Sequence, residues 1–170
     1  MIKAHYIEEK DAAVAALLLA EAASELKEDG KTLIDQLDAL YLTHGYFLET
    51  LGNLFLEGAE GMQQKTRMME SLRDDPPAKI AGLTVISSTH RVQASDGTFI
   101  LTFTLDDVHQ PIVYVRPSGT EPKVKFYVSV RDPRVKNGKV SLADAKREAA
   151  ALAKQLDDDI QAIVRERANA

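Results

Sequence analysis

The chain has 170 residues, enough for one globular domain or for one domain and part of another. Its composition, 45% hydrophobic and 28% charged, is that of an ordinary soluble globular protein, and its formal net charge of -5 argues against a nucleic-acid partner. The absence of cysteine excludes disulfides, thiolate metal ligands and a cysteine nucleophile. Because there is no signal-peptide pattern and no apolar run of roughly 20 residues, we expect a cytoplasmic protein without a membrane partner.

The first 45 residues contain two predicted helices. The first, Ala12–Lys27, follows a capping Asp11 and is apolar on nearly every side, which is typical of a helix covered on more than one face. The second spans Thr32–Thr43. Together these helices carry too little apolar material to form a core of their own.

Residues 46–170 are predicted to form an α+β unit. Alternating apolar and polar residues, as from Thr98 to Leu105 and from Lys123 to Val130, indicate strands with one buried face. The economical arrangement is a four- to five-stranded antiparallel sheet with two helices on one face. Strands are expected at residues 46–56, 83–87, 98–105, 112–115 and 123–130, and helices at residues 59–73 and 141–165.

The segment RPSGTEPK, residues 116–123, follows the fourth predicted strand and has the composition of an anion-binding loop. The planar guanidinium of Arg116 can hold two phosphate oxygens at once. Gly119 permits a close approach of the backbone to a ligand. Ser118 and Thr120 add hydroxyl groups beside amides that can form an anion nest.

Two lysines, Lys123 and Lys125, lie on the exposed side of the strand that follows this loop and add positive charge at its mouth. The alternative is a hairpin turn in which proline, serine, glycine and threonine serve only turn chemistry. A turn does not need an arginine together with two hydroxyl side chains. The residues therefore favour a phosphate site over a simple turn.

Two other groups of polar residues are assigned no function. Asp106, Asp107 and His109 cluster as metal ligands do, but they lie in a predicted turn between strands, and no metal site is expected. The run Asp157–Asp159 faces away from the apolar stripe of the last helix and is expected to be a solvated surface.

The segment VRPSGTEPKVKFYV, residues 115–128, closely resembles the phosphate-binding loop in the C-terminal domain of the α-D-phosphohexomutases, the phosphoglucomutase and phosphomannomutase family. Further stretches resemble successive landmarks of the phosphoglucomutase and phosphopentomutase branch: Lys10–Ala12, Gly30–Leu33, residues 40–46 and Leu56–Gly58. The resemblance thus covers the whole chain, and the loop is its most specific element.

In this family a phosphoserine of the first domain exchanges its phosphoryl group with a sugar phosphate, aided by a magnesium ion that the second domain holds. The third domain reads the sugar, and the fourth holds the phosphate that is not transferred. The resemblance also matches Lys10 to a third-domain lysine that approaches the substrate, the alternative being a charged residue in front of a helix. It implies that this chain holds the phosphate of a ligand such as glucose 1-phosphate or glucose 6-phosphate through Arg116, Ser118, Gly119, Thr120 and Lys125.

The family's serine loop, metal loop and sugar-reading motif are absent from these 170 residues, and Glu8 stands where an arginine is often found. The resemblance therefore implies helices of the third domain in residues 1–45 and a fourth domain, with a TATA-binding-protein-like fold, in residues 46–170. Such a chain should be inactive alone, without catalytic residues or metal ligands, and magnesium should belong to the parent enzyme.

The sheet that the helix Ala12–Lys27 should cover is also absent from these residues, so the helix should be exposed and promote self-association. An alternative function is a free-standing sugar-phosphate-binding or interaction module without catalysis.

Overall fold

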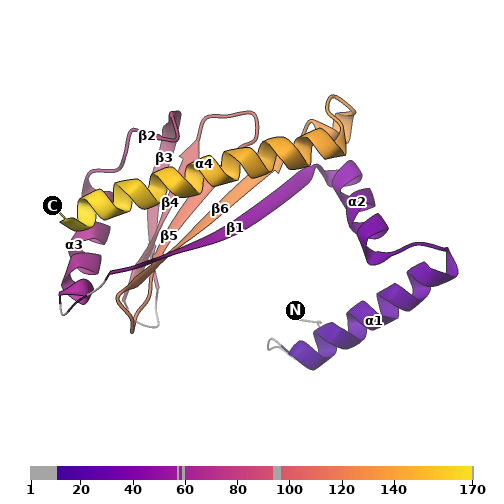
Figure 1. The fold of residues 1–170 in the computed structure, drawn as a ribbon, viewed down its shortest axis with the longest axis horizontal. Coiled ribbons are helices and arrows are strands. Elements are labelled where there is room, and N and C mark those ends of the chain that lie inside the picture. Colours follow the sequence, from indigo (N-terminus) through magenta and orange to yellow (C-terminus); the bar gives the residue numbers. More distant parts are fainter. Residues whose placement is uncertain (1–10, 57, 59, 94–96, 170) are drawn as a thin grey trace. The chain divides into compact units, whose positions relative to one another are not determined.

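The computed structural model describes residues 11–56, 58, 60–93 and 97–169. The chain divides into two compact units, Met1–His44 and Gly45–Ala170. Helices α1 (Ala12–Glu28) and α2 (Leu33–His44) belong to the first unit, and a sheet with two long helices belongs to the second (Figure 1). Among the described residues, none of the helices combines the length and the apolarity that a membrane span requires.

The two helices of the first unit begin at well-formed caps. The Asp11 carboxylate accepts hydrogen bonds from the amides of Ala13 at 2.8 Å and Val14 at 3.3 Å. Thr32 and Asp35 cap α2 reciprocally, because each side chain accepts from the other residue's amide. Neither helix contains a buried residue. Their exposed large apolar side chains are Leu17, Leu19, Leu33, Ile34, Leu37, Leu40 and Leu42.

The second unit is built on a six-stranded sheet in the order β1-β6-β5-β4-β3-β2, in which every pair is antiparallel. The strands nearest the two ends of the sheet-forming segment, β1 and β6, pair with each other. The strands are β1 (Tyr46–Phe55), β2 (Lys79–Ile80), β3 (Leu83–Val92), β4 (Phe99–Leu105), β5 (Ile112–Pro117) and β6 (Lys123–Asp132).

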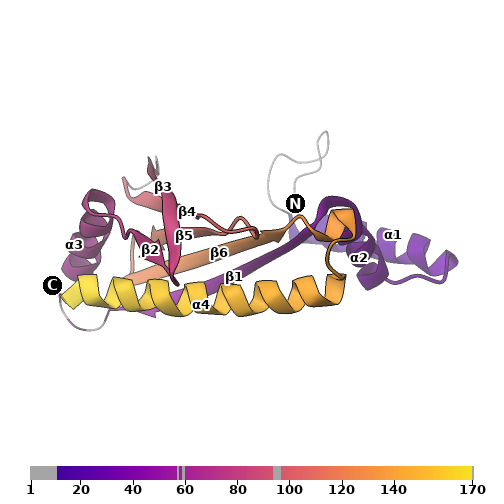
Figure 2. The same ribbon diagram turned by 90° about the horizontal axis from the view of Figure 1, so that it is seen from above.

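One face of this sheet carries the core. Helix α4 (Leu142–Asn169) runs along that face, and α3 (Gly61–Asp74) packs against α4 (Figure 2). The fully buried side chains of the three central strands point toward these helices and include Leu101, Phe103, Val113, Val115, Phe126 and Val128. Because side chains alternate along a strand, their neighbours form the open face of the sheet. The open face includes Tyr114, Arg116, Lys123, Lys125, Tyr127 and Arg131.

The α+β class, the antiparallel sheet and the two helices match the sequence-based expectation, but the strand number does not. The sheet has six strands rather than four to five. β2 has only two residues, too few to give a pattern. β3 was expected to end at Ser87 and runs to Val92, through a polar and largely exposed stretch. Pairing with β4 across a register shift near Ser87 makes this stretch a strand despite its composition.

The acidic run Asp157–Asp159 is not simply a solvated surface, which corrects the sequence-based expectation. The Asp159 carboxylate accepts from the amide of Ala81 at 2.6 Å, in the turn between β2 and β3. A side chain on Gly52 of β1 would place its Cβ 2.3 Å from Asp157 Oδ1. These two carboxylates therefore lie against the sheet, and Gly52 leaves room for one of them.

Gly45 offers a test of how β1 enters this fold. Its φ is +96°, and an added Cβ would lie 3.0 Å from the Asp132 carbonyl oxygen and 3.3 Å from Pro133 Cα. We expect Gly45→Ala to lower the free energy of unfolding by at least about 2 kcal/mol, through strain and overlap together. Chemical denaturation would measure this loss.

The matched control is Gly138→Ala, because Gly138 also has a positive φ, of +65°, but nothing within 4 Å of an added Cβ. That variant should lose only about 1 kcal/mol. Equal losses in the two variants would show that the contact with Asp132 and Pro133 is unimportant.

Candidate functional site

The loop singled out in the sequence connects β5 to β6. Arg116 lies opposite Lys125 in the antiparallel ladder, and Pro117 lies opposite Val124. Pro117 and Val124 are buried toward the helices. Arg116 and Lys125 therefore share the open face, where two cations flank the same end of the hairpin.

The two ends of the loop are held by hydrogen bonds of the backbone. The Ser118 amide donates to the Lys123 carbonyl at 2.8 Å, the Lys123 amide to the Glu121 carbonyl at 2.8 Å, and the Leu56 amide to the Pro122 carbonyl at 2.8 Å. The Glu121 amide donates to the Ser118 hydroxyl at 3.3 Å. Within the described part of the chain, no acceptor is found for the two consecutive amides of Gly119 and Thr120. Two adjacent amides of this kind are the donors from which an anion nest is made.

A carboxylate lies among the loop's positive charges. Glu121 Oε2 is 2.9 Å from Lys123 Nζ and accepts from the Ser118 hydroxyl at 3.4 Å. The hydrogen bond from Lys123 lowers the pKa of Glu121 most, with further contributions from the charge of Lys123 and from Ser118. Glu121 is therefore ionised at neutral pH. Beside the cations Arg116, Lys123 and Lys125 it leaves a formal charge of +2, which suits a dianion.

Beside the loop lies a hollow of about 150 Å³, which has room for several water molecules or a phosphate group. Four of the five residues expected to bind phosphate line it. Thr120 does not, although its amide is one of the two without an acceptor among the described residues. Lys10, the other candidate, lies outside the described residues. The lining residues are Arg116, Pro117, Ser118, Gly119, Glu121 and Lys125.

Sequence reasoning missed a lysine beneath the loop. Lys65 of α3 is 5% exposed, and its ammonium group donates to the carbonyl oxygens of Ser118 and Glu121. Its burial could have been predicted from its position in the helix. Lys65 precedes Met68, Met69 and Leu72 by three, four and seven residues, so it lies on the same buried stripe of α3. A charged residue on an apolar stripe needs buried hydrogen-bond partners.

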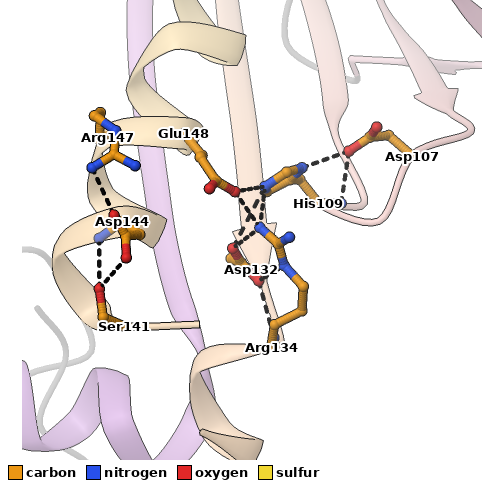
Figure 3. Close-up of polar contacts among 8 residues, drawn as sticks. All are labelled: Asp107, His109, Asp132, Arg134, Ser141, Asp144, Arg147 and Glu148. Carbon is orange, nitrogen blue, oxygen red and sulfur yellow. Dashed lines mark hydrogen bonds and ion pairs between the residues drawn. The ribbon is translucent and has the colours of Figure 1, made fainter. Parts of the chain in front are cut away.

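At the other end of β6, about 30 Å from the loop for a strand of ten residues, lies a cluster of charged residues (Figure 3). The Arg134 guanidinium donates to both carboxylate oxygens of Asp132, at 2.9 and 2.7 Å. Its Nη2 also contacts Glu148 Oε2 at 2.5 Å and His109 Nε2 at 2.9 Å. Because arginine only donates, His109 Nε2 accepts, and its Nδ1 carries the proton shared with Asp107 at 2.6 Å.

This cluster contains the three potential metal ligands that lie close together among the described residues: His109, Asp132 and Glu148. Arg134 Nη2 contacts all three, so a cation of the protein already occupies their centre. The arrangement therefore fits an internal ion network and not a metal site. Asp107 and His109 belong to this network, whereas the sequence pattern could only place them in a turn.

The structure defines an antiparallel α+β domain in which a central hairpin, β5–β6, ends in a loop flanked by Arg116 and Lys125. Residues 63–155 match the family model described as "Phosphoglucomutase/phosphomannomutase, C-terminal domain", and the chain belongs to this family.

Known relatives agree with this assignment. The chain is 35% identical over 140 residues to the phosphoglucomutase of Staphylococcus aureus strain USA300 and 36% identical over 139 residues to that of strain MRSA252. Each alignment covers 75% of this chain and 25% of the relative, so the chain spans about a quarter of their length.

A solved structure shares the fold. It is the open form of the exocytosis-sensitive phosphoprotein pp63/parafusin, a phosphoglucomutase from Paramecium. The likeness has a TM-score of 0.50 and 14% sequence identity, and it covers 92% of this chain and 28% of that one. At this identity the comparison supports the fold alone.

The Arg134 network predicts a stability effect that depends on pH. Asp132 is fully buried, and the hydrogen bonds from Arg134 hold its pKa below the usual 3.8. Arg134→Ala would leave this carboxylate buried without its cation, and we expect a loss of about 3–5 kcal/mol near neutral pH. Because the folded-state pKa of Asp132 is lowered, the pair stabilises the protein above pH 3.8, and its contribution disappears as the pH falls through the folded-state pKa.

Denaturation of the wild type and of Arg134→Ala at several pH values would therefore show a stability difference that narrows as the pH falls from neutral toward the folded-state pKa of Asp132. Lys154→Ala is the control, because the Lys154–Asp158 pair is exposed to water and should contribute little to stability. A pH-independent difference, or one no larger than that of the control, would contradict this account of the network.

Proposed function

We propose that the β5–β6 loop holds the phosphate group of a small phosphorylated ligand. The observation that carries this proposal is the pair of consecutive amides at Gly119 and Thr120, next to a hollow lined by Arg116 and Lys125. The Arg116 guanidinium would grip two phosphate oxygens, the two amides would grip a third, and the Ser118 hydroxyl would add a donor. Lys125 would balance the remaining negative charge.

We further propose that the ligand is a sugar phosphate such as glucose 1-phosphate or glucose 6-phosphate, and that the longer protein is a mutase. Membership of the phosphoglucomutase/phosphomannomutase family and the similarity to phosphoglucomutases support this substrate class. The contribution of this chain would be positional: one phosphate is held so that the other end of the sugar reaches a phosphoserine elsewhere in the protein.

In this proposal the reacting groups belong to the rest of the longer protein. The magnesium ion that the family implies would also be bound there, since Arg134 occupies the centre of the His109, Asp132 and Glu148 group. The magnesium would support phosphoryl transfer as a Lewis acid. The residues of this chain would bind and orient the substrate.

The two helices of the first unit support a second, structural part of the proposal. Neither α1 nor α2 buries a residue, and Leu17 and Leu19 of α1 are 69% and 54% exposed. We propose that residues 1–45 are the closing helices of a larger α/β domain, whose sheet they would cover. In this 170-residue chain the same surface should associate with a second copy.

The phosphate proposal predicts that Arg116→Ala abolishes measurable binding of glucose 1-phosphate. Removing the guanidinium would cost two charge-assisted hydrogen bonds of about 1.5–3 kcal/mol each. Because the isolated chain contacts only one part of the substrate, its affinity is too weak to survive this loss. Calorimetric titration of the wild type and the variant would measure the change.

Arg131→Ala is the matched control, because Arg131 lies on the open face at the far end of β6, over the ring of Phe47. Binding by this control should resemble the wild type. Equal affinity in Arg116→Ala and the wild type would disprove the phosphate site.

The association proposal predicts that the wild type forms dimers or larger species in sedimentation velocity and that Leu17→Glu/Leu19→Glu shifts it toward monomer. Charged side chains at these exposed positions would make the apolar surface unfavourable to bury. Lys27→Glu, near the end of the same helix, changes the net charge by the same amount and should leave association intact. A wild type that stays monomeric at high concentration would rule out this part of the proposal.

A further inference from the structure

Lys65 is a buried cation in direct contact with the loop, and its ammonium group donates to two backbone carbonyls there. Its Nζ is 2.5 Å from the Ser118 carbonyl oxygen and 3.0 Å from the Glu121 carbonyl oxygen, with Met62 Sδ at 3.5 Å. Lysine is rarely buried to 5% exposure unless its charge is compensated by hydrogen bonds. Two backbone carbonyls three residues apart are thus fixed at one point on α3.

We infer that Lys65 is a positioning residue that orients the two amides of the phosphate site; this inference rests on the proposed function. The carbonyl of Ser118 and the amide of Gly119 belong to one planar trans peptide, so they point in opposite directions. Because Lys65 holds that carbonyl toward α3, the Gly119 N–H is directed away from α3, toward the side of the sheet where Arg116 and Lys125 lie.

The second hydrogen bond completes this arrangement. By holding the Glu121 carbonyl, Lys65 fixes the far end of the short segment that contains Gly119 and Thr120. The Glu121 amide is fixed as well, by the Ser118 hydroxyl. With both ends of the segment held, the backbone conformations open to Gly119 and Thr120 are restricted, and with them the directions of the two amides. Without Lys65, the Ser118 carbonyl would lose its buried partner and the peptide would turn toward water.

The structure also gives Lys65 an accessible side. A hollow of about 240 Å³ lies between α3 and the start of β4, and Lys65 lines it together with Met69 and Phe99. A small cation could therefore enter the space left by a shortened side chain. Propylammonium has the three methylene-type carbons and the ammonium group that Lys65→Ala removes.

The primary test compares wild type, Lys65→Met and the control Gln63→Met, an exposed position on the same helix. Lys65→Met keeps the apolar length of the side chain and removes its charge. In ¹⁵N–¹H spectra without ligand, we expect the Gly119 and Thr120 amides to shift in Lys65→Met but not in Gln63→Met. Titration with inorganic phosphate should show affinity weakened at least about tenfold in Lys65→Met. Its melting temperature should stay close to that of the wild type.

Chemical rescue separates positioning from a general loss of structure. In Lys65→Ala, propylammonium should return the Gly119 and Thr120 amides toward their wild-type shifts and restore phosphate binding. Propanol, which has the same size without the charge, should do neither. Equal effects of propylammonium and propanol would contradict a role for the ammonium group.

The outcomes distinguish this inference from the function on which it rests. If phosphate shifts the Gly119 and Thr120 amides equally in the wild type and in Lys65→Met, the site stands and the inference about Lys65 is wrong. If phosphate does not shift these amides in the wild type, the proposed function is wrong. Unchanged Gly119 and Thr120 amides in ligand-free Lys65→Met would overturn the inference in either case.

Discussion

The register of the β5–β6 hairpin is the constraint on which the site depends. It places Arg116 opposite Lys125 and Pro117 opposite Val124. A shift by one residue would put the side chain of Arg116 on the same face as Val124, so one of the two strands would turn its cation toward the helices and its apolar side chains into water. The buried partners of Val124 therefore decide where the cations lie, so the packing of the core and the chemistry of the loop follow from one hydrogen-bonded ladder.

Helix α3 is the second element that fixes the position of the loop. Gly61, at its start, leaves no room for a side chain, because an added Cβ would lie 2.3 Å from the Leu56 carbonyl oxygen and 3.0 Å from Pro122 Cβ. This close approach brings Lys65 within reach of the loop's carbonyls. The loop is thus held by a ladder on one side and by a helix below it, which suits a site whose contribution is to position a ligand.

The sequence was sufficient to predict the strands whose own residues alternate between apolar and polar. Alternation predicted the central strands. The side chains around Arg116 also favoured an anion site, which stays a prediction. The missed features are non-local. β3 is a strand beyond Ser87 because of its partner β4, and Lys65 is buried because of two carbonyls more than fifty residues away. No pattern within one segment could reveal the carboxylates that surround Arg134.

The central claim is that the loop between β5 and β6 binds a phosphate group. A crystal structure of the protein with glucose 1-phosphate tests it most directly. The account predicts phosphate oxygens that accept from the Gly119 and Thr120 amides and from the Arg116 guanidinium. A phosphate group bound elsewhere on the protein, with this loop unoccupied at saturating ligand, would contradict it.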